Sequence, residues 1–316
     1  MASGSGRIGC GVFLPLAGLD WDALRARAEL VERLGYDALW LDDHFWFPGA
    51  PEQDHLDVWT ALSALAVATE RIALGPLVAC QSYRSPGILA KTAASVASVS
   101  RGRLVLALGA GWMEEEYRAY GFPFPPPRVR LEQLGECLEI VRRLCRDERA
   151  SFEGRHSSVR EAPFRPKPDR LPIVLGGAGD RLLGLAARYA DGWNCPNPAW
   201  RELAQKREVL ARHCRAIGRD PATIDVSEQV IVVVGRDAAE VRRERAVAEE
   251  RLASFARFDG DVHVGTPAEV AAALRARADL GVQSFAVMFG DYGGAEQIEL
   301  FAREVVPLLE APARAT

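Results

Sequence analysis

Short apolar runs alternate with helical patterns along most of this chain, and this alternation restricts its fold more than any other feature. Each run is bounded by Gly, Pro or Asp. Parallel strands joined by crossover helices produce such an order, because a short turn cannot connect two parallel strands. The runs that we expect to form strands are residues 8–14, 38–41, 72–78, 104–108, 173–175, 192–194, 226–234 and 284–289. Eight strand–helix units predict an α/β fold, a (β/α)8 TIM barrel.

A doubly wound open sheet is the alternative architecture. Such a domain opens with a Gly-x-Gly-x-x-Gly turn directly after its first strand. Residues 11–15 contain no such turn, and the glycines at 176–179 come too late in the chain to open one. The barrel is therefore the favoured fold.

The alternation is interrupted between residues 112 and 168. This segment begins with a short acidic helix, continues through a proline cluster at 123–127 and a long helix, and ends in an irregular stretch. An excursion of this length commonly covers a site or supports an interface. We expect one domain over residues 1–316, with the insertion 112–168 after the fourth strand and with flexible termini.

Charge and cysteine content restrict the partners and the compartment. A formal net charge of −4 provides no basic field for nucleic acid or an anionic membrane. The chain has no run of the ~18 apolar residues that a membrane span requires. Its six cysteines are scattered without a Cys-x-x-Cys pair, which is typical of buried thiols in a reducing compartment. We expect a cytoplasmic protein that acts on a small-molecule substrate, without nucleic acid or membrane partners.

Three strand ends carry residues suited to chemistry, and in a barrel the active site lies at the carboxyl ends of the strands. A histidine there can exchange a proton near neutral pH, and glycine N–H groups before a helix can bind phosphate. Without a ligand, the same glycines would form a tight turn, and an acidic residue would stabilise a helix N-terminus. The residues in question are Asp43 and His44 after the second strand, Gly109, Gly111, Trp112 and Glu114 after the fourth, and Gly176, Gly177 and Gly179 after the fifth.

Acidic and histidine side chains between residues 42 and 57 raise the alternative of a metal-dependent hydrolase. His44 and His55 are not at helical i,i+4 spacing, and the first strand lacks the His-x-His pair that a barrel hydrolase would supply. The chain also lacks a Gly-x-Ser-x-Gly elbow for a serine nucleophile. We therefore predict no metal site.

Several motifs, in a consistent order along the chain, resemble the luciferase-like monooxygenase superfamily. Within it, the chain is most similar to the coenzyme F420-dependent oxidoreductases. The matching segments cover roughly residues 8 to 307 and include 34–40 with 43–45, 69–75, 85–86 with 89–91, 100–103, 109–112 with Glu116, 176–179, 187–194, 265–267 and 281–282.

This resemblance implies hydride transfer between coenzyme F420 and a small organic substrate. It implies that His44 exchanges the substrate proton, with Glu114 as a second acid, and that a non-proline cis peptide joins Leu77 and Val78 behind the cofactor ring. The glycines of the fifth strand end would hold the cofactor phosphate. The full set that it implies for cofactor binding is Asp43, His44, Leu77, Val78, Gly109, Gly111, Trp112, Gly176, Gly177 and Gly179.

Other functions and the assembly stay open at this point. An FMN-dependent monooxygenase supplied by a separate flavin reductase would fit the same superfamily, as would a flavin-binding barrel without turnover. The resemblance also implies a homodimer formed through helices near the second to fourth strands. The small side chains of residues 91–97 would permit close helix packing there, although burial against the barrel explains them equally well.

Overall fold

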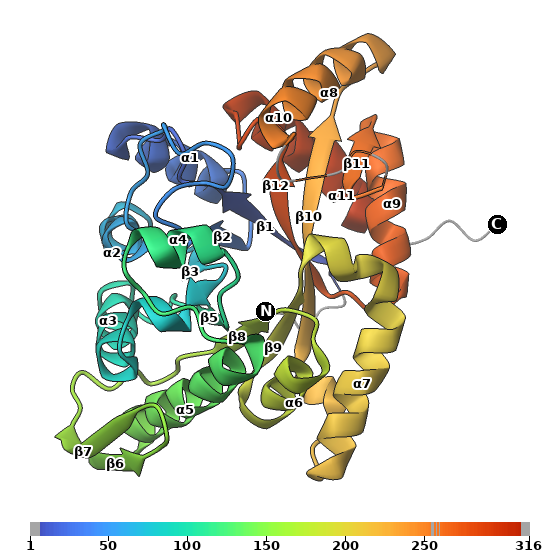
Figure 1. Ribbon diagram of the computed structural model, residues 1–316. Coiled ribbons are helices and arrows are strands. Elements are labelled where there is room, and N and C mark those ends of the chain that lie inside the picture. The colour runs from blue at the N-terminus through green and yellow to red at the C-terminus, as the bar shows by residue number, and fades with distance from the viewer. Residues whose placement is uncertain (1–6, 254–255, 257, 259, 311–316) are drawn as a thin grey trace.

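A parallel sheet curved into a barrel, surrounded by helices, forms the centre of the computed structural model (Figure 1). The structure describes residues 7–253, 256, 258 and 260–310. The flexible termini expected from the sequence lie outside the described residues.

The strands follow the predicted apolar runs. The peptide between Leu77 and Val78 is cis, at the predicted position. The third expected strand, 72–78, contains β3, and the separate strand β4 begins just after it. The strands of the barrel path are β1 (Gly9–Leu14), β2 (Ala38–Leu41), β3 (Ala73–Pro76), β4 (Ala79–Cys80), β5 (Leu106–Gly109), β8 (Ile173–Gly176), β9 (Gly192–Cys195), β10 (Asp225–Val234) and β12 (Ser284–Phe289). A further strand, β11 (Val262–Gly265), pairs with β10 outside this path and was not predicted.

Hydrogen bonding closes the sheet into a barrel. The order is β3-β2-β1-β12-β10-β9-β8-β5-β4, and every named pair on this path is parallel. Leu74 of β3 also pairs in parallel with Leu104, which lies just before β5. The two ends of the path therefore meet, which confirms the predicted TIM-barrel class.

Helices cover the outside of this barrel. The first helix begins where Asp20 accepts a hydrogen bond from the Ala23 N–H at 2.8 Å, and its chain turns away at Gly35, where φ is 83°. None of the helices among the described residues is long and apolar enough to cross a membrane. The longer helices are α1 (Trp21–Arg33), α2 (Val58–Ala68), α3 (Pro86–Val99), α5 (Pro127–Arg146), α6 (Asp180–Tyr189), α7 (Leu203–Ala216), α8 (Ala238–Leu252) and α9 (Pro267–Asp279), and the shorter ones are α4 (Glu114–Ala119), α10 (Ala295–Leu300) and α11 (Val306–Glu310).

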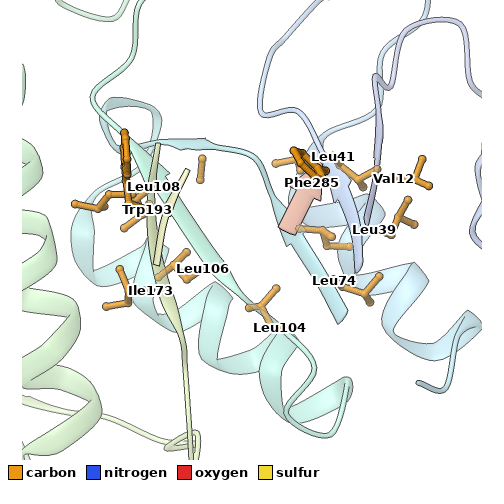
Figure 2. Packing of buried hydrophobic residues seen from close by; sticks show 14 of the residues in the cluster. Val12, Leu39, Leu41, Leu74, Leu104, Leu106, Leu108, Ile173, Trp193 and Phe285 are labelled. Atoms are coloured by element: carbon orange, nitrogen blue, oxygen red, sulfur yellow. The ribbon is translucent and has the colours of Figure 1, made fainter. Parts of the chain in front are cut away.

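Strand side chains alternate between the helix layer and the barrel interior, as the pleat requires. Leu104, Leu106 and Leu108 belong to the cluster that packs between sheet and helices, and Figure 2 shows them in a row along the chain. Val105 and Ala107 belong to a second cluster in the interior. Burying a leucine side chain contributes about 1.5–3 kcal/mol, so the outer cluster holds the helices on the barrel.

The segment 112–168 is organised differently from the prediction. Helix α5 packs against α3 and α6, so it is the fourth helix of the barrel rather than part of an insertion. The stretch expected to be irregular contains an antiparallel hairpin of β6 (Arg149–Glu153) and β7 (Ser158–Pro163), which lies at the end of α5 in Figure 1. Glu136 of α5 fixes the hairpin turn because its carboxylate accepts N–H groups from residues 155–157 at 2.8–2.9 Å.

Candidate active site

His44 follows β2 and meets an acidic side chain from a distant part of the sequence. Its Nδ1 lies 2.9 Å from Oε2 of Glu116, a residue of α4. The edge of its ring contacts Trp112, with ring centroids 5.6 Å apart and an interplanar angle of 80°. The imidazole is thereby held between the end of β2 and residues of the chain that follows β5.

Glu116 is wholly buried and has several hydrogen-bond partners. Besides contacting His44, it accepts the Phe45 N–H at Oε1 and the Tyr83 hydroxyl at Oε2, the latter at 2.5 Å. Tyr83 ends a short 3-10 helix, η1 (Gln81–Tyr83), directly after β4. Two separate segments, one after β2 and one after β4, therefore meet at the carboxylate of Glu116.

The charge state of His44 depends on these contacts. Burial lowers the pKa of the imidazole, but the hydrogen bond with Glu116 and the nearby charges of Asp42 and Asp43 outweigh it and raise the pKa above its ordinary value. The His44 side chain keeps 18% of its surface exposed. Because Nδ1 is occupied by Glu116, Nε2 is the ring nitrogen left for a substrate.

The carboxylate of Asp43 is bound by a backbone N–H of β4 and by the guanidinium of Arg84. Its carboxylate accepts the Cys80 N–H at 2.9 Å and two contacts from Nη1 of Arg84 at 2.7 and 3.0 Å. Burial raises the pKa of Asp43, and Arg84 opposes that rise. These bonds connect the end of β2 to β4, so in this structure Asp43 holds the strand that follows the cis peptide.

The neighbouring Asp42 points to a different partner. It accepts the Leu16 N–H and a hydrogen bond from Nε2 of His55, both at 2.8 Å. Burial raises the pKa of Asp42, but the contact with His55, the charge of His44 and the Leu16 N–H together outweigh it, so the net shift is downward. Asp42 therefore fixes the first loop after β1.

Gly109 and Gly176 face Val78 inside the barrel. A Cβ on either glycine would lie 2.6 Å from a methyl carbon of Val78. These two glycines were predicted to bind the cofactor, and the structure shows that they make room for the side chain after the cis peptide. Gly111, with φ at +78°, makes room for Tyr117, because a Cβ there would lie 1.9 Å from the hydroxyl oxygen.

Gly179 is open, in contrast to the glycines that precede it. A Cβ on Gly177, whose φ is +134°, would lie 2.8 Å from Leu182, whereas none of the described residues comes within 4 Å of a Cβ on Gly179. Gly179 is the N-cap of α6, and no side chain in the described part of the chain caps that end. The first N–H groups of a helix have no partner within the helix, so this end offers donors and a positive dipole to an anion.

Glu114 and Trp112 lie toward solvent. Glu114 pairs with Arg118 at 2.6 Å on the exposed side of α4, away from the His44 contact. Trp112 is 58% exposed. The structure therefore brings Glu116, rather than the predicted Glu114, to His44; Glu116 already lies in a segment that carries the family resemblance.

Aromatic side chains form a wall next to His44. Phe45 stacks on Tyr120 with ring centroids 3.9 Å apart, and Trp46 stacks on the same ring at 6.0 Å. Phe45 and Phe122 also pack against Tyr83, at 4.8 and 5.2 Å. Tyr120 and Phe122, the partners of the aromatic side chains after β2, come from the chain around α4.

Comparisons with known proteins identify the family of this chain. Residues 8–260 match the family model described as luciferase-like monooxygenase. An F420-dependent hydroxymycolic acid dehydrogenase from Mycobacterium tuberculosis is 31% identical over 245 residues, which cover 74% of this chain and 65% of that protein. An F420-dependent glucose-6-phosphate dehydrogenase from Kineococcus radiotolerans is 26% identical over 310 residues, which cover 89% of this chain and 91% of that protein. The chain thus spans slightly less than two thirds of the mycobacterial relative and most of the second.

Solved structures share the fold over nearly the whole chain. An F420-dependent secondary alcohol dehydrogenase in complex with an F420-acetone adduct has a TM-score of 0.84 at 23% identity, with 96% of this chain and 100% of that chain covered. A coenzyme F420-dependent tetrahydromethanopterin reductase from Methanopyrus kandleri has a TM-score of 0.81 at 18% identity, with 95% and 99% covered. At these identities the likeness establishes the barrel.

Proposed function

This chain belongs to the luciferase-like monooxygenase family, and from that premise we propose that it is an oxidoreductase that transfers a hydride between coenzyme F420 and a small organic substrate. The F420-dependent relatives described above support the choice of cofactor. The observation that carries the proposal is the placement of His44 at the end of β2, with one ring nitrogen bound to Glu116 and the other left for substrate.

His44 supplies the proton chemistry in this proposal. Oxidation of an alcohol to a carbonyl removes a hydride from the carbon, which the deazaflavin would accept, and a proton from the hydroxyl on the same carbon. Nε2 of His44 accepts that proton as the carbonyl forms, and it returns the proton in the reverse reaction. The hydrogen bond with Glu116 raises the pKa of His44, and a raised pKa makes the imidazole a stronger base.

The described residues fit a cofactor that carries a phosphodiester. Gly179 leaves open space at the N-terminus of α6, where N–H groups would bind the phosphate. The cis peptide between Leu77 and Val78 and the imidazole of His44 would hold the ring at the other side. Bound there, the deazaflavin would supply the hydride acceptor or donor that side chains lack.

We further propose that the substrate is uncharged and partly apolar around its reacting carbon. The wall beside His44 consists of aromatic rings, which contribute apolar contact area. Two cations of this face already have acidic partners: Arg84 pairs with Asp43 and Asp57, and Arg118 pairs with Glu114. A secondary alcohol or its ketone matches this chemistry better than a phosphorylated sugar does.

A binding titration tests the cofactor proposal. Purified protein is titrated with F420 and with FMN, and binding is followed by cofactor fluorescence. We expect F420 to bind, and we expect Gly179→Ala to weaken binding by about tenfold because the new methyl group occupies the open space. Gly87→Ala is the matched control, because Gly87 also has nothing within 4 Å and lies in the first turn of α3. Tight FMN binding without F420 binding or hydride exchange would favour an FMN-dependent monooxygenase.

We also propose that the chain pairs with a second copy through α2 and α3. Val67 of α2 and Ile88 and Val99 of α3 are 75%, 60% and 50% exposed. In an interface through these adjacent helices, the three exposed aliphatic side chains would leave water, which favours association. Sedimentation at micromolar concentration should give a dimer for the native chain and a monomer for Ile88→Glu, and a native monomer would contradict the proposal.

A further inference from the structure

Tyr83 reaches the same carboxylate oxygen as His44, although the two side chains come from different strand ends. The Tyr83 hydroxyl and His44 Nδ1 lie 2.5 and 2.9 Å from Oε2 of Glu116. The backbone N–H of Phe45 occupies Oε1. From this geometry we infer that Tyr83 and Glu116 are positioning residues that hold His44 with its proton on Nδ1 and its Nε2 toward substrate. The inference rests on the function proposed above and extends it to the residues that prepare His44.

The hydrogen-bond pattern around Glu116 supports this tautomer. An ionised carboxylate only accepts hydrogen bonds, and a backbone N–H only donates them. The Phe45 amide and the Tyr83 hydroxyl therefore act as donors to a carboxylate, and His44 Nδ1 completes the set when it carries a hydrogen. With the proton on Nε2 instead, the Nδ1 lone pair would face a carboxylate oxygen at 2.9 Å without a hydrogen between them.

Tyr83 is held as a neutral donor by its surroundings. Its ring packs against Phe45, Tyr117 and Phe122, with centroids 4.8, 5.2 and 5.2 Å away. Burial raises the pKa of Tyr83 far above its ordinary value, so the hydroxyl keeps its hydrogen at any physiological pH. The aromatic wall thus serves two purposes, since it lines the site and fixes the donor that shares the charge of Glu116.

The other charged groups around His44 have their own partners. Asp42 is bound by His55, and Asp43 is bound by Arg84. Both raise the pKa of His44 through their charge, whereas Glu116 also makes the hydrogen bond to its ring. A change in the donors to Glu116 should therefore reach His44 directly, while the two aspartates stay as they are.

The apo protein allows the tautomer to be measured without any cofactor. In protein labelled with 15N-histidine, long-range 1H–15N spectra distinguish a protonated Nδ1 from a protonated Nε2. Above the pKa of His44 we expect the Nδ1–H form. An Nε2–H form in the wild-type protein would overturn the inference, whatever the variants do.

Substitution of Tyr83 tests whether this residue helps to position His44 through Glu116. In Tyr83→Phe, Glu116 loses one donor, so more of its negative charge acts on His44 and favours the imidazolium. The pKa of His44 should rise by about 0.4–1 unit, which corresponds to the loss of one ordinary hydrogen bond. Tyr36→Phe is the matched control, because the Tyr36 hydroxyl is also buried and donates one hydrogen bond, to the Ile298 carbonyl at 2.8 Å, away from His44.

Kinetics provide the second readout. The acidic limb of the pH profile of kcat/KM with F420 should move upward in Tyr83→Phe by the same amount as the pKa of His44, and Tyr36→Phe should move neither. An unchanged pKa of His44 in a folded Tyr83→Phe protein would refute the role of Tyr83. A protein that shows the expected tautomer and shift but no turnover with F420 would instead refute the proposed function, so the two failures are distinguishable.

Discussion

Glu116 and Glu228 are both 0% exposed, yet their surroundings differ completely. Glu116 accepts hydrogen bonds from a backbone amide, a tyrosine and a histidine at the barrel end. Glu228 lies on β10, and neither of its carboxyl oxygens has a hydrogen-bond partner among the described residues. Burial alone therefore does not determine what a carboxyl group does, because the donors around it decide whether it stays charged.

The neighbours of Glu228 explain its state. Burial raises the pKa of Glu228 to about 7, and the positive charge of Arg277 opposes this only in part. Arg277 stacks on the ring of Trp200, 3.1 Å from its centroid. A carboxyl group with a pKa near 7 titrates in the physiological range.

Among the predictions that test the difference between Glu116 and Glu228, the largest expected effect is the loss of turnover when His44 is removed. His44→Ala takes away the base that Glu116 orients, so turnover with F420 should fall roughly 10²–10⁴-fold, the usual range for a positioned acid or base. The melting temperature should change little, since the His44 side chain is partly exposed. Steady-state kinetics and thermal denaturation measure the two effects.

His156→Ala is the matched control for this prediction. His156 also contacts a glutamate, Glu132, at 3.4 Å, but it belongs to the hairpin of β6 and β7. Its loss should leave turnover unchanged. Full activity in His44→Ala would exclude the proton-transfer role.

The second prediction concerns the pH dependence of stability. Between about pH 4.5 and 7 the folded protein keeps the proton of Glu228 and the unfolded chain has lost it, so stability should fall as the pH rises through this window. The contribution lost is about 3 kcal/mol. Glu228→Gln removes the titrating group, so its urea-unfolding free energy should lack this decline. A wild-type protein whose stability shows the same pH dependence as the variant would contradict the raised pKa.

Near neutral pH, Glu116→Gln should lower the stability of the protein, in contrast to Glu228→Gln. Glu116→Gln replaces an acceptor oxygen with an amide NH2 group among three donors, which leaves at least one buried donor unpaired and costs about 1–3 kcal/mol. Glu228→Gln should instead be neutral or stabilising at pH 7, since it removes a buried charge. Urea unfolding of both variants at pH 7 measures the difference in stability. Equal destabilisation would contradict the proposed difference between the surroundings of Glu116 and Glu228.

The sequence predicts the barrel better than it predicts the site. Strand–helix alternation is a local pattern, so the eight runs led to the correct fold class, and the resemblance located the cis peptide after Leu77. The hairpin β6–β7 was missed because Glu136, on the preceding helix, fixes its turn. Glu116 was not predicted as the partner of His44 for a similar reason, because the inward face of α4 is set by the packing of Tyr117 beside Gly111, which a run of glutamates does not indicate.

Glu114 gives the smallest expected effect and shows what an acidic residue contributes without burial. It forms an exposed i,i+4 pair with Arg118 on α4, and such pairs contribute about 0.3–0.5 kcal/mol. Glu114→Gln should therefore leave turnover with F420 within about twofold of wild type and change stability by no more than about 0.5 kcal/mol. Steady-state kinetics of Glu114→Gln beside Glu116→Gln separate the two residues on the same helix. A loss of turnover in Glu114→Gln as large as that of His44→Ala would mean that Glu114 reaches the reacting atoms when substrate is bound, and it would restore the role that the sequence first suggested.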